Sequence, residues 1–263
     1  MRHKIGKAFM FLGTALIVGA LALFIWNNHE SSEAESQVSE ILPQIHQKVL
    51  EARTVLQEIY SAKANVEDSS SDLQINSPTD LPSENHEEDP GLPGILDTTD
   101  NGNSSDIQVS TYQTYPYDII QNTPVEFLTE EQLKMTEVKI NGNSYIGYIT
   151  IPDLNLELPV MANWNYSQLR ISPCRYAGSV RGKDMVILAH NYKSHFGNIS
   201  KLRLGDNVYF TDMDGNVWSY EIVATDILGP YDVEEMMSGE YDLTLFTCTP
   251  GGSYRVTVRC MQI

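Results

Sequence analysis

The first pattern along the chain is an unbroken hydrophobic run over residues 8–26, AFMFLGTALIVGALALFIW, in which Thr14 is the only conventional polar residue. A helix needs about 20 apolar residues to cross the hydrocarbon core of a bilayer. The run therefore predicts a transmembrane anchor over residues 8–26. Trp26 stands at its end, where interfacial aromatic side chains are enriched in membrane proteins.

Charged residues on the two sides of this run predict its orientation. Arg2, Lys4 and Lys7 precede it, and acidic residues follow it from Glu30 onward. Because positively charged flanks stay inside the cell, we expect a cytoplasmic tail over residues 1–7 and a single-pass protein of the cell membrane with its remaining chain outside. A cleaved signal peptide is the alternative, but it requires a small-x-small cleavage site. The residues that follow the run contain none.

Apolar residues then recur at helical spacing up to residue 62. They are Val38, Ile41, Leu42, Ile45, Val49, Ala52, Val55, Leu56 and Ile59. This spacing predicts an amphipathic helix, and Pro43 predicts that the helix begins near that residue. We interpret residues 27–66 as a helical stalk. A dimerisation zipper is the alternative, but the segment covers few heptads, and the stalk is favoured.

Residues 67–110 are rich in Ser, Asp, Glu, Asn and Pro. Low hydrophobicity with excess negative charge predicts a disordered acidic linker, which would let a folded domain work some distance above the bilayer. The chain has a net charge of −18, and residues 27–110 hold 17 acidic against 3 basic residues. Nucleic-acid binders usually carry a basic patch in their folded part. The sequence shows none, so we expect no nucleic-acid partner.

From residue 144 to the end, short β-rich runs alternate with turn signals. The runs are Tyr145–Ile151, Glu157–Met161, Met185–Ala189, Asn207–Thr211, Val217–Thr225, Leu243–Phe246 and Arg255–Met261. Many short strands at this spacing predict a barrel or a sandwich. Short helices are expected near Glu130–Thr136 and Val233–Met237. We assign residues 111–263 to this mainly β domain.

The segment Asp212-Met213-Asp214-Gly215-Asn216 has two interpretations. It resembles the start of a calcium loop, and Glu221 stands seven residues after Asp214, where that pattern requires a glutamate. However, the intervening residues alternate like a strand, and the flanking helices of such a loop are missing. We therefore predict the Asp-Gly turn of a β-hairpin.

The three cysteines fall into two environments. Cys174 and Cys260 fit buried thiols, since free cysteine commonly packs as a small hydrophobic residue. Cys248 ends the hydrophobic strand that begins at Thr244, and Pro250 then stops strand pairing. A thiol at that place is presented at the rim of the domain, where a neighbouring base or cation must activate it. No cysteine has zinc-ligand spacing, and we expect neither a metal nor an organic cofactor.

The strand after Cys248 supplies a cation. Basic and polar residues alternate with apolar ones from Arg255 to Cys260, so Arg255 and Arg259 share one face. If residues 249–254 form a hairpin loop, Cys248 lies opposite Arg255, and Arg259 lies about 13 Å further along the strand. Arg255 is therefore the better candidate to stabilise negative charge beside the thiol, and Arg259 is the alternative.

These strings resemble one known family. The string TLFTCTPGGSYRVTVR, residues 244–259, is similar to the sortase signature, Thr-Leu-x-Thr-Cys with an arginine on the next strand. MVILAH, residues 185–190, resembles the sortase strand that ends in the catalytic histidine, and residues 145–152 and 196–206 resemble neighbouring family segments. The resemblance implies a sortase-type eight-stranded β-barrel with short helices.

The resemblance also implies residue roles. Cys248 would be the nucleophile, His190 the general acid and base, and Arg255 the residue that stabilises the oxyanion. Thr247 would assist through its hydroxyl or its backbone. His195, five residues after His190 in a polar loop, is expected to be a surface residue.

Two features depart from the family pattern. Ala189 stands where the family usually has glycine before the histidine. The loop between Cys248 and Arg255 is short, which implies an altered mouth of the substrate groove.

The implied activity is that of a cysteine transpeptidase, a peptidase of the hydrolase class. It would cleave an LPxTG-like sorting signal of a surface protein or pilin and transfer it to an amine of a cell-wall cross-bridge or pilin lysine. One alternative is another extracytoplasmic cysteine enzyme, such as an L,D-transpeptidase, but the His-Gly-Cys-x-Arg string of that family is absent here. The other is a non-catalytic surface binding module, which leaves the set of His190, Cys248 and Arg255 unexplained.

Overall fold

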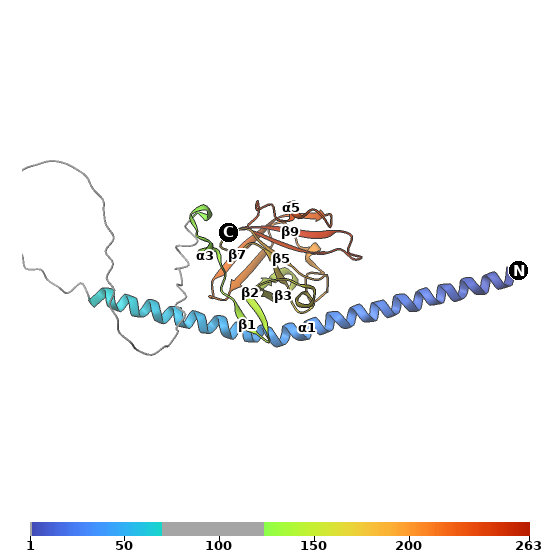
Figure 1. The fold of residues 1–263 in the computed structure, drawn as a ribbon, viewed down its shortest axis with the longest axis horizontal. Helices are drawn as coiled ribbons and strands as arrows, with labels where there is room; N and C mark the ends of the chain where they lie inside the picture. Colours follow the sequence, from blue (N-terminus) through green and yellow to red (C-terminus); the bar gives the residue numbers. More distant parts are fainter. Residues whose placement is uncertain (1, 70–123) are drawn as a thin grey trace, which may run out of the picture. The chain divides into compact units, whose positions relative to one another are not determined.

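The computed structural model describes residues 2–69 and 124–263, which form one long helix and a β domain (Figure 1). The helices are α1 Arg2–Ser69, α3 Glu130–Leu133, α4 Tyr166–Leu169 and α5 Val233–Met236, with short 3₁₀ turns at Val125–Phe127, Pro152–Leu154 and Ile199–Lys201. The strands are β1 Val138–Ile140, β2 Asn143–Ile151, β3 Leu156–Met161, β4 Cys174–Ala177, β5 Met185–Leu188, β6 Asn207–Asp212, β7 Val217–Leu228, β8 Leu243–Cys248 and β9 Arg255–Gln262.

Eight strands close into a barrel. Their order is β2-β3-β4-β5-β8-β9-β7-β6, and β6 pairs back onto β2 through residues 147–150 of β2. The first residues of β2 pair with the short β1, which lies outside the ring. Most neighbours are antiparallel, whereas β3 and β4, and likewise β5 and β8, run parallel. The predicted eight-stranded β-barrel with short helices is confirmed.

The parallel pair β5 and β8 forms the wall that positions the site. Ile187 and Leu245 pack into the barrel interior, and Leu188 and Phe246 belong to a second buried cluster on the outer face. Strands buried on both faces read as continuous hydrophobic runs instead of alternating ones. This explains why the sequence around both strands lacks alternation.

Three short elements of the structure were not predicted from the sequence. β1 and β4 have three and four residues, too few for a recognisable alternation. Helix α4 is a single turn, held by the Asn165 side chain, which accepts a hydrogen bond of 2.9 Å from the backbone N–H of Gln168. The two predicted short helices are present as α3 and α5, and α3 starts with a capping box between Thr129 and Gln132.

Helix α1 is continuous from Arg2 to Ser69, so the predicted helix start near Pro43 is wrong. A proline in a helix interior lacks the N–H that would donate to the preceding turn and bends the helix without necessarily ending it. Figure 1 shows α1 bending as it passes the barrel. The first part of α1 is long and apolar enough to cross a membrane, and its side chains from Met10 to Trp26 face outward, almost all of them exposed.

The middle of α1 packs against the barrel. Ile41, Ile45 and Val49 are buried in one cluster with Tyr145 of β2. Polar contacts flank this face, including the ion pair of 2.8 Å between His46 and Glu157 of β3. Over these turns, the apolar helical face predicted from periodicity is therefore docked on the barrel. The interpretation of residues 27–66 as a stalk did not include this contact.

The turn after β6 is the predicted hairpin. The buried carboxylate of Asp212 accepts hydrogen bonds from the backbone of Asp214 and Asn216 and from the indole N–H of Trp218, at 2.9 to 3.1 Å. Burial raises the pKa of Asp212, and these hydrogen bonds partly oppose that shift. The predicted disordered linker begins too early, because residues 67–69 are the last residues of α1; from residue 70 onward it lies outside the described residues.

Candidate active site

Cys248 is the last residue of β8, and its side chain is partly exposed where the five preceding strand residues are buried. Strand β8 lies between β5 and β9, so its backbone is held on both sides. The strand therefore fixes the position of the thiol at the edge of the barrel wall.

Arg255 lies directly opposite Cys248 in the antiparallel pairing of β8 with β9. The connecting loop turns through Gly251 and Gly252, which have φ values of +86° and +77°, in the region that favours glycine. Nη1 of Arg255 donates hydrogen bonds to the carbonyl oxygens of Gly252 at 2.9 Å and Tyr254 at 3.1 Å. The predicted register is confirmed, and the loop orients the guanidinium.

His190 follows β5 at the same end of the barrel. Because β5 and β8 are parallel, their carboxyl ends meet, and the backbone N–H of Ala189 donates to the carbonyl of Phe246 at 3.1 Å. Burial lowers the pKa of His190 below its ordinary value. The carboxylate of Glu30 opposes this shift, and the guanidinium of Arg170 adds to it.

Cys248, His190 and Arg255 line one pocket with a volume of about 220 Å³. Its other walls are mostly apolar or aromatic and come from β4, β5, β8, α4 and α5, and from the loop segments before α4 and α5. They include Trp164, Leu169, Tyr176, Val233, Met236 and Phe246. A thiol, an imidazole and a guanidinium around one apolar pocket are the groups that nucleophilic acyl transfer requires.

Residues 149–263 match the family model of the Sortase domain. This segment is therefore similar to a sortase domain. The sortase family are cysteine transpeptidases, and a thiol, an imidazole and a guanidinium at one pocket fit this similarity. An L,D-transpeptidase, considered from the sequence, has no support from this match.

Individual relatives of the sortase domain are distant. Sortase A of Bacillus anthracis is 24% identical over 148 residues, which cover 54% of this chain and 69% of that protein. A structure of sortase A from Corynebacterium diphtheriae is 26% identical with a TM-score of 0.43, and the match spans 46% of this chain and only 61% of that one. A structure of Streptococcus pneumoniae sortase C is 27% identical with a TM-score of 0.43. That match covers 52% of this chain and 72% of that one.

Arg259, the alternative arginine, has a different environment from Arg255. Its side chain is 3% exposed and donates to the carbonyl oxygens of Glu235 at 2.6 Å and Met236 at 3.1 Å, and to the hydroxyl of Thr244 at 3.0 Å. It also pairs with Asp226 at 3.3 Å. These contacts tie α5 to the barrel and occupy the guanidinium, which is not among the groups that line the pocket.

Thr247 is buried, and its hydroxyl donates to the carbonyl oxygen of Ala189 at 2.8 Å. The hydrogen bond connects the residue before Cys248 with the residue before His190. The hydroxyl therefore holds the two strand ends together, and its suggested assistance in catalysis stays a prediction.

His195 is fully buried, so the prediction of a surface residue is wrong. The polar loop after His190 folds back on itself, with the N–H groups of His195 and Gly197 donating to the carbonyl of Tyr192. Burial, with a smaller contribution from His190, lowers the pKa of His195 to about 4, and an interaction with the Ile171 backbone only partly offsets this. The polar sequence of the loop did not predict that the His195 side chain is buried.

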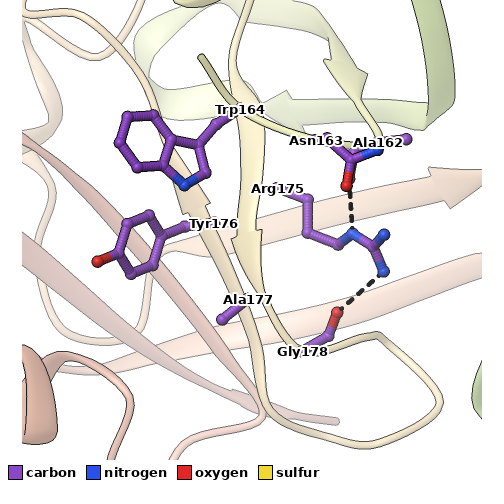
Figure 2. Close-up of a pocket in the computed structure, with 7 residues that line it drawn as sticks. All are labelled: Ala162, Asn163, Trp164, Arg175, Tyr176, Ala177 and Gly178. Carbon is purple, nitrogen blue, oxygen red and sulfur yellow. Dashed lines mark hydrogen bonds between the residues drawn. The ribbon is translucent and has the colours of Figure 1, made fainter.

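A second hollow of about 390 Å³ adjoins the pocket and shares Trp164 and Tyr176 with it. Figure 2 shows these two rings on one side of β4 and Arg175 on the other. The ring centroids are 5.7 Å apart. Arg175 donates to the carbonyl oxygens of Ala162 at 2.8 Å and Gly178 at 3.3 Å, so its guanidinium braces the backbone. The aromatic walls were not predicted from the sequence, because Tyr176 lies in the four-residue strand β4 and Trp164 lies in the loop before α4.

Proposed function

We propose that this protein is a membrane-anchored cysteine transpeptidase. It cleaves an LPxTG-like sorting signal and transfers the acyl part to an amine. The observation that carries the proposal is the shared pocket of Cys248, His190 and Arg255. The apolar walls of that pocket suit the leucine and proline side chains of such a motif.

In the first step, the thiol of Cys248 has given its proton to His190, and the thiolate attacks the carbonyl carbon of the threonine in the sorting signal. The electron pair of the C=O bond moves to the oxygen, and Arg255 donates hydrogen bonds to the resulting oxyanion. As the C–N bond breaks, the protonated imidazole of His190 gives its proton to the leaving amine. The product is a thioester on Cys248.

In the second step, an amine nitrogen attacks the thioester carbonyl. Its proton passes to His190, the C–S bond breaks, and Cys248 leaves as the thiolate. A cell-wall cross-bridge or a pilin lysine supplies the amine, and the donor is a surface protein or pilin. The chemistry needs only the residues of the chain and the two substrates.

Because His190 must be protonated to donate, its lowered pKa has a consequence for the rate. The imidazolium fraction falls as pH rises through the lowered pKa of His190, so we expect a basic limb in the pH profile of cleavage. The hydrophobic start of α1 supports a single-pass anchor with the sortase domain outside the cell.

The test is to incubate the full-length chain in detergent with a fluorescent LPxTG peptide, with and without triglycine. We expect cleavage between threonine and glycine, and a ligated product only when the amine is present. Cys248→Ala should abolish both products. Cys174→Ala is the matched control, because it removes a buried thiol outside the pocket. Activity of Cys248→Ala within a few-fold of the unaltered protein would end the proposal.

A further inference from the structure

We propose that Glu30 of α1 is a positioning residue for His190 and acts through Tyr192. The anchor helix would then contribute to the active site in addition to holding the domain at the membrane. This inference rests on the proposed function, because it assigns His190 a catalytic role.

Two contacts connect Glu30 with His190. The phenol O–H of Tyr192 donates to a carboxylate oxygen of Glu30 at 3.0 Å. The Tyr192 ring stacks on the imidazole of His190, with centroids 4.7 Å apart and planes 27° apart. Tyr192 is buried, so the phenol has little freedom to move away. The carboxylate therefore fixes the plane on which the imidazole rests.

Ser31, the residue after Glu30, contacts the loop that follows His190. The hydroxyl of Ser194 lies 3.0 Å from the carbonyl oxygen of Ser31, to which it donates, and 3.3 Å from the Ser31 hydroxyl. The loop is internally rigid, because the N–H of Phe196 donates to the carbonyl of His190 at 3.1 Å. Neighbouring residues of α1 thus hold the loop at both Tyr192 and Ser194.

The charges that face His190 come from several elements. Glu30 lies on α1, Arg170 at the end of α4, and His195 in the loop, while Cys248 and Arg255 share the pocket. The carboxylate of Glu30 raises the pKa of His190, against the effects of burial and Arg170. Burial and the bond to Glu30 raise the pKa of Tyr192 to about 12, so the phenol stays a donor.

Glu30 lies just after the predicted membrane anchor along α1. Glu30 follows Trp26, the end of the hydrophobic run, by four residues, which is about 6 Å along a helix. The helix is continuous between them. The group that orients His190 is therefore attached directly to the end of the membrane anchor.

The test compares Glu30→Gln with Glu33→Gln in the full-length chain in lipid nanodiscs. Glu33 is a matched control, since it lies one turn along the same helix, is exposed, and contacts only His29 at 3.6 Å among the described ion pairs. The His190 imidazole is titrated by NMR. We expect Glu30→Gln to lower the pKa of His190, because the carboxylate that raises it is neutralised, and Glu33→Gln to leave it unchanged. Equal titration curves for Glu30→Gln and the unaltered protein would overturn the proposal.

Kinetics provide the second readout. The basic limb of the pH profile for peptide cleavage should move to lower pH in Glu30→Gln and in Tyr192→Phe. Glu30→Ala, unlike Glu30→Gln, removes the acceptor of the Tyr192 O–H, so the double variant Glu30→Ala/Tyr192→Phe should show less shift than the sum of its two single variants. A purely additive double variant would contradict the connection through Tyr192.

The two readouts separate this inference from the proposed function. If the unaltered protein does not cleave the peptide but Glu30→Gln shifts the His190 titration, the proposed function is refuted and the coupling of Glu30 to His190 is supported. If the unaltered protein cleaves the peptide but the His190 titration is unchanged in Glu30→Gln, the coupling is refuted and the proposed function is supported.

Discussion

At the scale of single residues, the fold assigns different tasks to side chains of the same type. Burial raises the pKa of Cys174 and Cys260 to about 12, whereas Cys248 lines the pocket. The two arginines of β9 differ in the same way: Arg255 lines the pocket, and Arg259 is buried under α5. Sequence alternation predicted the shared face of these arginines, but only the packing of α5 separates their environments.

This separation predicts opposite effects for two alanine variants. Arg255→Ala should lower kcat/KM for peptide cleavage by about 100- to 1,000-fold, as loss of one oxyanion donor does, with little change in stability. Arg259→Ala should instead lower the free energy of unfolding by about 2–4 kcal/mol, because it leaves buried carbonyl groups without donors. Urea denaturation and steady-state kinetics on both proteins measure the two effects. A larger loss of stability in Arg255→Ala would refute the assignment.

His195 predicts an acid-sensitive stability. Its folded pKa of about 4 lies below the ordinary value of 6.5, so the unfolded chain binds more protons between these values. Stability from this group is therefore complete above pH 6.5 and is lost as pH falls towards 4, by roughly 3 kcal/mol.

The thermal midpoint measured between pH 7.5 and 4.5 checks this expectation. His195→Phe should show a shallower fall of the midpoint than the unaltered protein, because it cannot titrate. His29→Gln changes an exposed histidine and serves as the control. Parallel curves for His195→Phe and the unaltered protein would contradict the explanation.

At the scale of elements, α1 shows both the strength and the limit of sequence patterns. The spacing of Ile41, Ile45 and Val49 predicted one apolar helical face, and the structure buries all three. The pattern could not tell what covers that face, because amphipathicity is the same for a stalk, a zipper and a docked helix. The helix start predicted near Pro43 was wrong, because a proline inside a long helix can bend the helix without ending it.

The docked face predicts a difference between two neighbouring apolar positions. Ile45 is fully buried and Leu50 is 64% exposed. Ile45→Ala should destabilise the packing of α1 on the barrel by about 2–5 kcal/mol, the usual cost of removing a buried aliphatic side chain. Leu50→Ala should change little.

Hydrogen exchange of the backbone amides in β2 and β3, with urea denaturation, measures this difference. Equal effects of Ile45→Ala and Leu50→Ala would mean that α1 does not pack on the barrel in solution.

At the scale of the whole molecule, the sequence predicted the barrel, most of its strands and the three residues that line the pocket. These features depend on local strand signals and on a strong motif around Cys248. The burial of His195, the contact of Glu30 with Tyr192 and the aromatic walls at Trp164 and Tyr176 were not predicted. They arise from contacts between residues far apart in the chain, such as Glu30 with Tyr192, for which one sequence carries no local signal.

The central claim is that Cys248, His190 and Arg255 act together at one pocket to transfer an acyl group. Tandem mass spectrometry of the full-length protein, quenched in acid during turnover of an LPxTG peptide, tests it most directly. The account predicts a thioester on Cys248 that accumulates without an amine and disappears when triglycine is added. A peptide adduct on Cys174 or Cys260, or cleavage that proceeds without any adduct on Cys248 under single-turnover conditions, would contradict it.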